Sequence, residues 1–136
     1  MKPNTLTVVT LLSIILLPFH VAGDVVLGFD TGGPRVVYVL LPVLLVMACG
    51  ALLLPERRWG YVIMFIGGLV ALGMPVIHRN TGFTAAVAKS PGGIFFIWTL
   101  IALGVTGGLA MILSARGLWT LRSRRTDPQG TGARVP

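Results

Sequence analysis

Four apolar stretches, each about long enough to cross a lipid bilayer, constrain this chain more than any other feature. A membrane-spanning helix needs about 20 mostly apolar residues, with about 17 as the lower limit. Backbone in lipid must satisfy its own hydrogen bonds, and stretches this long and continuous are helices rather than barrel strands. The sequence therefore predicts an all-α polytopic membrane protein, a four-transmembrane-helix bundle. The predicted spans, none of which contains Asp, Glu, Lys or Arg, are residues 5–21, 36–54, 61–77 and 94–115.

The composition and the distribution of charge agree with this prediction. With 54% hydrophobic and 11% charged residues, the chain cannot cover a water-soluble globule, so apolar surface must face lipid. The net charge of +7 indicates membrane orientation rather than nucleic acid as a partner, because the basic residues flank the apolar stretches. Eight of the 11 Lys and Arg residues fall on one side of the predicted membrane. We therefore predict a bacterial cytoplasmic membrane protein with both termini and the turn at residues 55–60 in the cytoplasm.

The chain is predicted to form one transmembrane domain over residues 1–121, followed by a disordered basic cytoplasmic tail over residues 122–136. A second interpretation of the N-terminal stretch is a signal peptide cleaved after Gly23, since small residues precede that position. In the outer loop, Thr84 is placed to cap a short helical segment that ends at Lys89.

His20 and His78 end the first and third predicted helices, which puts both imidazoles at the outer membrane boundary. Facing histidines in a helical bundle can hold a haem, and with Asp24 or Asp30 they can bind a transition metal. The alternatives are two interfacial histidines with their polar tips in water, or a proton-sensitive contact. The interfacial interpretation makes no cofactor the default prediction, with haem or a transition metal as the alternative.

Proline recurs in the outer halves of three predicted helices, where each ring removes one backbone donor and frees a carbonyl. We expect these helices to kink at a common level and to leave a polar cavity beneath the outer loops, unless neighbouring groups satisfy the freed carbonyls. The residues concerned are Pro18, Pro42 and Pro75.

Small residues recur at intervals of three and four in the third and fourth predicted helices, and such spacing lets helix backbones approach closely. They predict either packing within the bundle or the contact face of a homo-oligomer. They are Gly67, Gly68 and Ala71 in the third helix, and Gly104 and Gly108 in the fourth.

The sequence lacks the residues that several classes of function require. The one cysteine, Cys49, excludes an internal disulfide, a redox pair and a thiolate zinc site. The predicted spans hold no ionisable carboxylate or amine, which argues against an ion-coupled transporter. No hydrolytic or nucleotide-binding motif is present, so we do not expect an enzyme.

Four short motifs resemble those of a family of small, uncharacterised bacterial four-helix integral membrane proteins. They are His20-x-x-x-Asp24, Pro55-Glu56-Arg57-Arg58-x-Gly60-Tyr61, Pro75-x-x-His78 and Ser114-Ala115-Arg116-Gly117-Leu118-Trp119. This family has no established activity, so the resemblance implies a fold and no catalytic role. In size and helix number the chain also resembles small multidrug-resistance transporters, but it lacks their carboxylate in the first helix.

The resulting prediction is an accessory or interaction protein of the membrane, with a membrane-protein partner or a second copy of itself. The alternatives are a haem-binding or metal-binding electron-transfer subunit that uses His20 and His78, or a transporter component.

Overall fold

The computed structural model describes residues 4–29 and 33–126, and this part of the chain is helical with connecting turns. Four of its helices are long and apolar enough to cross a membrane, which confirms the predicted fold class of a multi-pass four-helix bundle. The helices are α1 (Thr5–Val26), α2 (Pro34–Leu52), α3 (Arg58–Ile77), α4 (Ala85–Lys89) and α5 (Gly93–Thr126).

Two of the long helices continue well past the predicted spans. α1 runs on to Val26, so Asp24 belongs to a helix and not to the loop expected from the sequence. α5 continues to Thr126, so the prediction that disorder starts at residue 122 is wrong for residues 122–126, while residues 127–136 lie outside the described chain. Apolar length sets how much of a helix fits in lipid, but a helix ends only where the sequence supplies a breaker. The first proline after the start of α5 is Pro128, which lies beyond the end of this helix.

The residues that precede α1, α2 and α4 explain why these helices begin where they do. Asn4 caps α1, because its side chain accepts a hydrogen bond from the Thr7 backbone N–H at 2.8 Å. Gly33 precedes α2 with a φ of 94°, which favours glycine, and Pro34 then opens the helix at a position where no backbone donor is needed. The predicted cap of α4 is confirmed, since the Thr84 hydroxyl accepts from the Val87 N–H at 3.3 Å.

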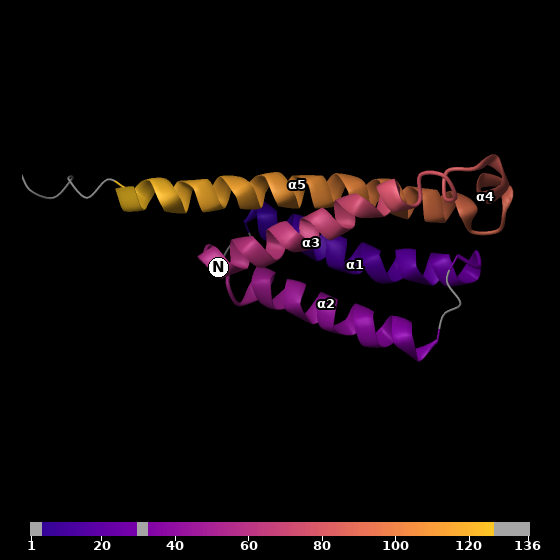
Figure 1. The fold of residues 1–136 in the computed structure, drawn as a ribbon, viewed down its shortest axis with the longest axis horizontal. Coiled ribbons are helices and arrows are strands. Elements are labelled where there is room, and N and C mark those ends of the chain that lie inside the picture. The colour runs from indigo at the N-terminus through magenta and orange to yellow at the C-terminus, as the bar shows by residue number, and fades with distance from the viewer. Residues whose placement is uncertain (1–3, 30–32, 127–136) are drawn as a thin grey trace, which may run out of the picture.

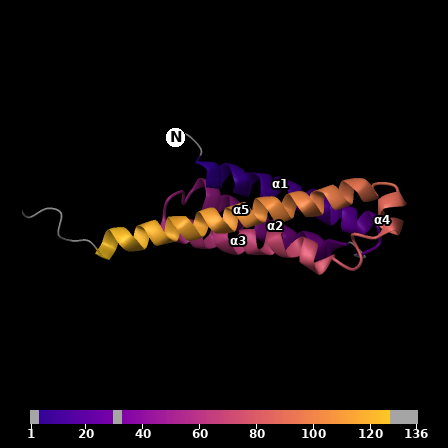
Figure 2. The same cartoon turned by 90° about the horizontal axis from the view of Figure 1, so that it is seen from above.

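The long helices form three layers (Figure 1). α5 lies along one side, α1 and α3 lie next to it, and α2 lies on the far side, with no contact between α2 and α5 in the described chain. Seen from above, α5 crosses over the pair α1 and α3 (Figure 2). α1 begins and α5 ends at the same end of the bundle. This end holds the turn 53–57 and Arg122, and we call it the arginine end. The opposite end holds His20, His78 and α4, and we call it the histidine end.

Buried apolar side chains form three small clusters, and α5 contributes to each of them. They are Leu6, Val9, Ala51, Met64 and Ala110; Leu17, Ala71 and Leu103; and Val87, Phe96 and Leu100. α1 and α5 are also joined by a hydrogen bond from the Ser13 hydroxyl to the Thr106 hydroxyl oxygen at 2.9 Å. Because α5 contributes to all three clusters, most of the buried apolar packing in the described chain involves this helix.

The predicted small-residue faces divide between two neighbours. Gly68 and Ala71 pack on α5, where the backbone of Gly107 comes closest, whereas Gly67 packs against Met47 of α2. Gly104 lies beside the Pro75 ring and Gly108 beside the Leu72 side chain, both on α3. These glycines therefore serve contacts inside the bundle.

Candidate metal site

His20, Asp24 and His78 converge at the histidine end of the bundle. His20 and Asp24 lie one turn apart on α1, an arrangement that follows from the i, i+4 spacing once the helix continues past Gly23. His78 follows directly after α3 and is its C-terminal cap. One ligand atom from each of the three residues can be chosen so that all lie within 4.8 Å of one another. Asp30, the other predicted ligand, lies outside the described residues.

The Asp24 carboxylate lies between the two imidazoles. Its Oδ2 is 3.5 Å from His20 Nε2 and its Oδ1 is 3.1 Å from His78 Nε2. Ligands bound to a tetrahedral ion at about 2.0–2.1 Å are separated from one another by about 3.3 Å, so these two distances bracket the value that such an ion requires. Each imidazole nitrogen is thus about as far from its nearest carboxylate oxygen as two ligands of one ion would be, and the three residues offer ligand atoms within 4.8 Å of one another.

His78 is held in an orientation suited to metal binding. Its Nδ1 lies 3.1 Å from the Met74 carbonyl oxygen, and since a carbonyl only accepts, Nδ1 carries the proton and donates it. In a neutral imidazole this leaves a lone pair on Nε2, facing Asp24. Metal-binding histidines commonly donate their other ring N–H to a backbone carbonyl in this way. The His78 ring forms an ion pair with the carboxylate if Nε2 also carries a proton, and in the neutral ring a cation between the two groups would remove their repulsion.

His20 is the most deeply buried member of the group. Its side chain is 0% exposed, compared with 13% for His78 and 15% for Asp24. Neither ring nitrogen of His20 has a hydrogen-bond partner in the described chain, and its contact with Asp24 is long for a hydrogen bond. A buried polar group left in this state costs about 1–3 kcal/mol. A cation bound at Nε2 would satisfy one of the two ring nitrogens of His20, and it would give Nε2 of His78 a partner as well.

Aromatic rings close the site on the side of α5. The Phe96 ring stacks on His20 with ring centroids 4.9 Å apart, and it meets His78 edge-on at 5.7 Å. Phe29 lies 5.5 Å from Phe96 and 6.0 Å from His78. Phe96, which is buried and belongs to α5, covers the buried side of the cluster, whereas Phe29 lies on the side of the cleft that Asp24 and His78 also line.

The same packing argues against haem as the ligand. The His20 and His78 rings touch each other at a centroid separation of 5.1 Å and lie perpendicular, with Phe96 stacked on one of them. A haem held between two histidines needs a planar gap between the rings, and these rings leave none. A single ion fits, because it needs only the space between the three ligand atoms.

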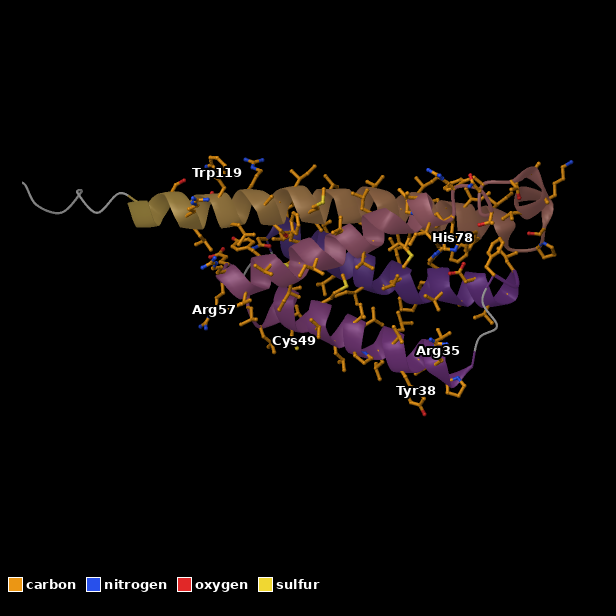
Figure 3. All side chains as sticks on the ribbon, viewed as in Figure 1. Arg35, Tyr38, Cys49, Arg57, His78 and Trp119 are labelled. Atoms are coloured by element: carbon orange, nitrogen blue, oxygen red, sulfur yellow. The ribbon has the colours of Figure 1, made fainter. Side chains whose placement is uncertain are left out.

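The open side of the cluster faces a cleft of about 590 Å³. Asp24 and His78 line this cleft, and Arg35, from the first turn of α2, lines it as well. Arg35 and His78 lie at the same end of the molecule on neighbouring helices (Figure 3). The cleft supplies a route by which an ion or a ligand can reach the site.

Sequence reasoning identified His20, Asp24 and His78 as candidates, and the structure brings these three together. The sequence places Phe96 only among the aromatic residues near the outer membrane boundary and Arg35 only among the charges that set the topology, so neither is predicted to belong to the site. Sequence reasoning also did not find the Met74 carbonyl, since a backbone acceptor has no sequence signature. Pro18, Pro42 and Pro75 lie inside α1, α2 and α3, each of which continues past its proline, so the predicted kinks stay a prediction.

Asp24 is an ionisable residue in one of the candidate membrane-spanning helices, since it lies in the last turns of α1. The absence of a carboxylate from the predicted spans therefore does not exclude an ion-coupled transporter. Asp24 lies at the end of the helix and not at its middle.

The fold and the site define a multi-pass helical membrane protein with a histidine and aspartate cluster at one end of its bundle. Comparisons of the chain with protein families, curated proteins and solved structures find no match. The resemblance to small bacterial four-helix proteins therefore stays an interpretation of the sequence motifs.

Proposed function

We propose that this protein binds one divalent transition-metal ion through His20, Asp24 and His78. The observation that carries the proposal is the buried imidazole of His20, which lacks a hydrogen-bond partner and lies with His78 around a single carboxylate. Two imidazole nitrogens and one carboxylate oxygen suit first-row ions such as Zn²⁺, and they suit Ca²⁺ and Mg²⁺ poorly, because those ions prefer oxygen ligands alone.

Three protein ligands leave a tetrahedral ion with one open position. Structural zinc sites use four protein ligands, whereas sites that act on another molecule keep a position for water or for that molecule. The cleft beside Asp24 and His78 is where this position is reached. The accessory or interaction role predicted from the sequence is compatible with such a site, and its partner stays a prediction, as does its place in a bacterial cytoplasmic membrane.

The test is a zinc-binding measurement on the protein purified in mild detergent with an affinity tag that contains no histidine. Competition against a chromophoric chelator should give one Zn²⁺ per chain for the wild type. His20→Ala, His78→Ala and Asp24→Asn should each weaken binding by about 100-fold or more, because even groups that only hydrogen-bond to a metal ligand contribute about 10–100-fold to metal affinity.

The matched control is Glu56→Gln, which neutralises a carboxylate in the turn at the arginine end and should leave zinc affinity unchanged. Wild-type protein with no stoichiometric zinc, or an affinity that is equal in all four variants, would show that the cluster is not a metal site. Circular dichroism of each variant separates loss of the ligand from loss of the fold.

A further inference from the structure

The cleft beside the metal site has a polar end and an apolar wall. Asp24, His78 and Arg35 line the cleft with polar or charged groups, and Arg35 and His78 lie at the same end of the molecule (Figure 3). The wall is formed by Leu17, Val21, Val39, Val43, Val70 and Met74, which come from α1, α2 and α3. A ligand that fills this cleft therefore needs a charged or polar head and an apolar body.

The cleft exists because α2 packs closely only at the arginine end. Its buried residues, Met47, Gly50 and Ala51, all belong to its C-terminal half. The N-terminal half of α2 is mostly exposed, and it diverges from α1 toward the histidine end (Figure 1). In a membrane-spanning bundle the exposed apolar faces are in contact with lipid, so molecules of the bilayer can enter the cleft from the side.

The charges at the polar end favour an anion. A divalent ion bound by one carboxylate and two neutral imidazoles retains one positive charge, and Arg35 adds another. A guanidinium binds two oxygens of a phosphate at once, and a terminal phosphate group has a third oxygen that can bind the ion. A carboxylate has only two oxygens and cannot occupy both positions equally well.

We propose that the cleft binds a membrane lipid that carries a terminal phosphate group. One phosphate oxygen takes the open position on the ion, the Arg35 guanidinium binds the others, and an acyl chain lies against the apolar wall. This proposal rests on the proposed metal site, and it adds the class of molecule that the ion holds.

The experiment measures the binding of phosphatidic acid to the purified protein in detergent, with Zn²⁺ present and after its removal by EDTA. Phosphatidylcholine and oleate are compared as lipids that lack the terminal phosphate. Phosphatidic acid should bind at least about tenfold more tightly with Zn²⁺ than without it, and at least about tenfold more tightly than either comparison lipid, as expected for charge-assisted contacts.

Two substitutions on the same helix separate the cleft from the general lipid-facing surface. Val39 and Val37 are similarly exposed, at 62% and 57%, but only Val39 lines the cleft. Val39→Trp should therefore lower the affinity for phosphatidic acid several-fold, while Val37→Trp leaves it unchanged. Arg35→Gln should lower it by about tenfold or more, because the charged partner of the phosphate is lost. All three variants should keep wild-type zinc affinity.

The outcomes distinguish the two proposals. If the wild type binds Zn²⁺ but binds phosphatidic acid no better than phosphatidylcholine or oleate, the lipid proposal is overturned and the metal site stands. The same conclusion follows if Val39→Trp and Val37→Trp have equal effects. If lipid-free wild type binds no Zn²⁺, the metal site is overturned, and the metal-dependent lipid contact with it.

Discussion

Adding one methyl group at either of two neighbouring glycines of α5 should have different effects on the stability of the bundle. A Cβ at Gly107 would lie 2.5 Å from the Leu72 backbone nitrogen and 2.6 Å from the Gly68 carbonyl oxygen. These are backbone atoms of α3, so no side-chain rotation can relieve the clash, and the two helices must separate. A Cβ at Gly108 would lie 3.7 Å from the Leu72 side chain, which is an ordinary contact.

The magnitudes follow from two opposing contributions. Replacing glycine by alanine inside a helix stabilises it by about 0.5–1 kcal/mol, and this gain applies to both positions. Forcing a methyl group into a packed interface costs about 1–3 kcal/mol, and this cost applies only to Gly107. Gly107→Ala should be destabilising and Gly108→Ala neutral or stabilising. Because the helix-propensity gain cancels in the comparison, the two variants should differ by about 1–3 kcal/mol.

The assay is reversible unfolding in mild detergent titrated with sodium dodecyl sulfate, followed by circular dichroism, with oligomer mass measured in parallel. Equal effects of the two substitutions on the free energy of unfolding would refute the packing of α3 on α5 through Gly107. A change of oligomer mass in Gly108→Ala would instead favour the homo-oligomer face that the GxxxG spacing also allows.

Two further predictions test the orientation and the nature of the ligand. Replacing Arg57 and Arg58 by alanine should weaken the preference of the turn at residues 55–60 for the cytoplasm, since positive charges in a short loop set the orientation. A reporter fused at the C-terminus should then show mixed topology. A single unchanged topology would contradict the predicted orientation. Purified protein mixed with haem should give no Soret shift that depends on His20 or His78, because the two rings leave no planar gap; a shift lost on changing either histidine would restore the haem interpretation.

The membrane-spanning helices could be predicted because their signal is local and strong. A charge-free apolar stretch of sufficient length has few alternatives in lipid. The ends of the helices were less predictable, since Gly23 and Asp24 resemble loop residues and the tail after Leu121 resembles a disordered segment. In α1 this error had a consequence for the site, because Asp24 reaches its position beside His20 only if the helix continues past Gly23.

The site could be predicted in part. The interval between His20 and Asp24 is visible in the sequence, and topology places His78 at the same end of the bundle. Whether His78 turns toward the other two residues depends on how α3 packs on α1 and α5, and that is set by distant contacts such as the one between Gly68 and Gly107. The contribution of Phe96 and the divergence of α2 are also properties of the packed bundle, so no local pattern indicates them.

The location of Asp24 bears on why the cluster exists. Of the four acidic residues, Asp24 is the one that the described structure places in a membrane-spanning helix. A charged group in such a position is costly unless it is paired, and ionisable residues within membrane helices commonly have a function. Two imidazoles beside it are polar but supply no positive charge while they are neutral. A divalent ion bound between the carboxylate and the two imidazoles would supply that charge, and it would give Nε2 of His20 and Nε2 of His78 a partner at the same time. The proposed metal site would therefore stabilise the end of α1 that carries Asp24.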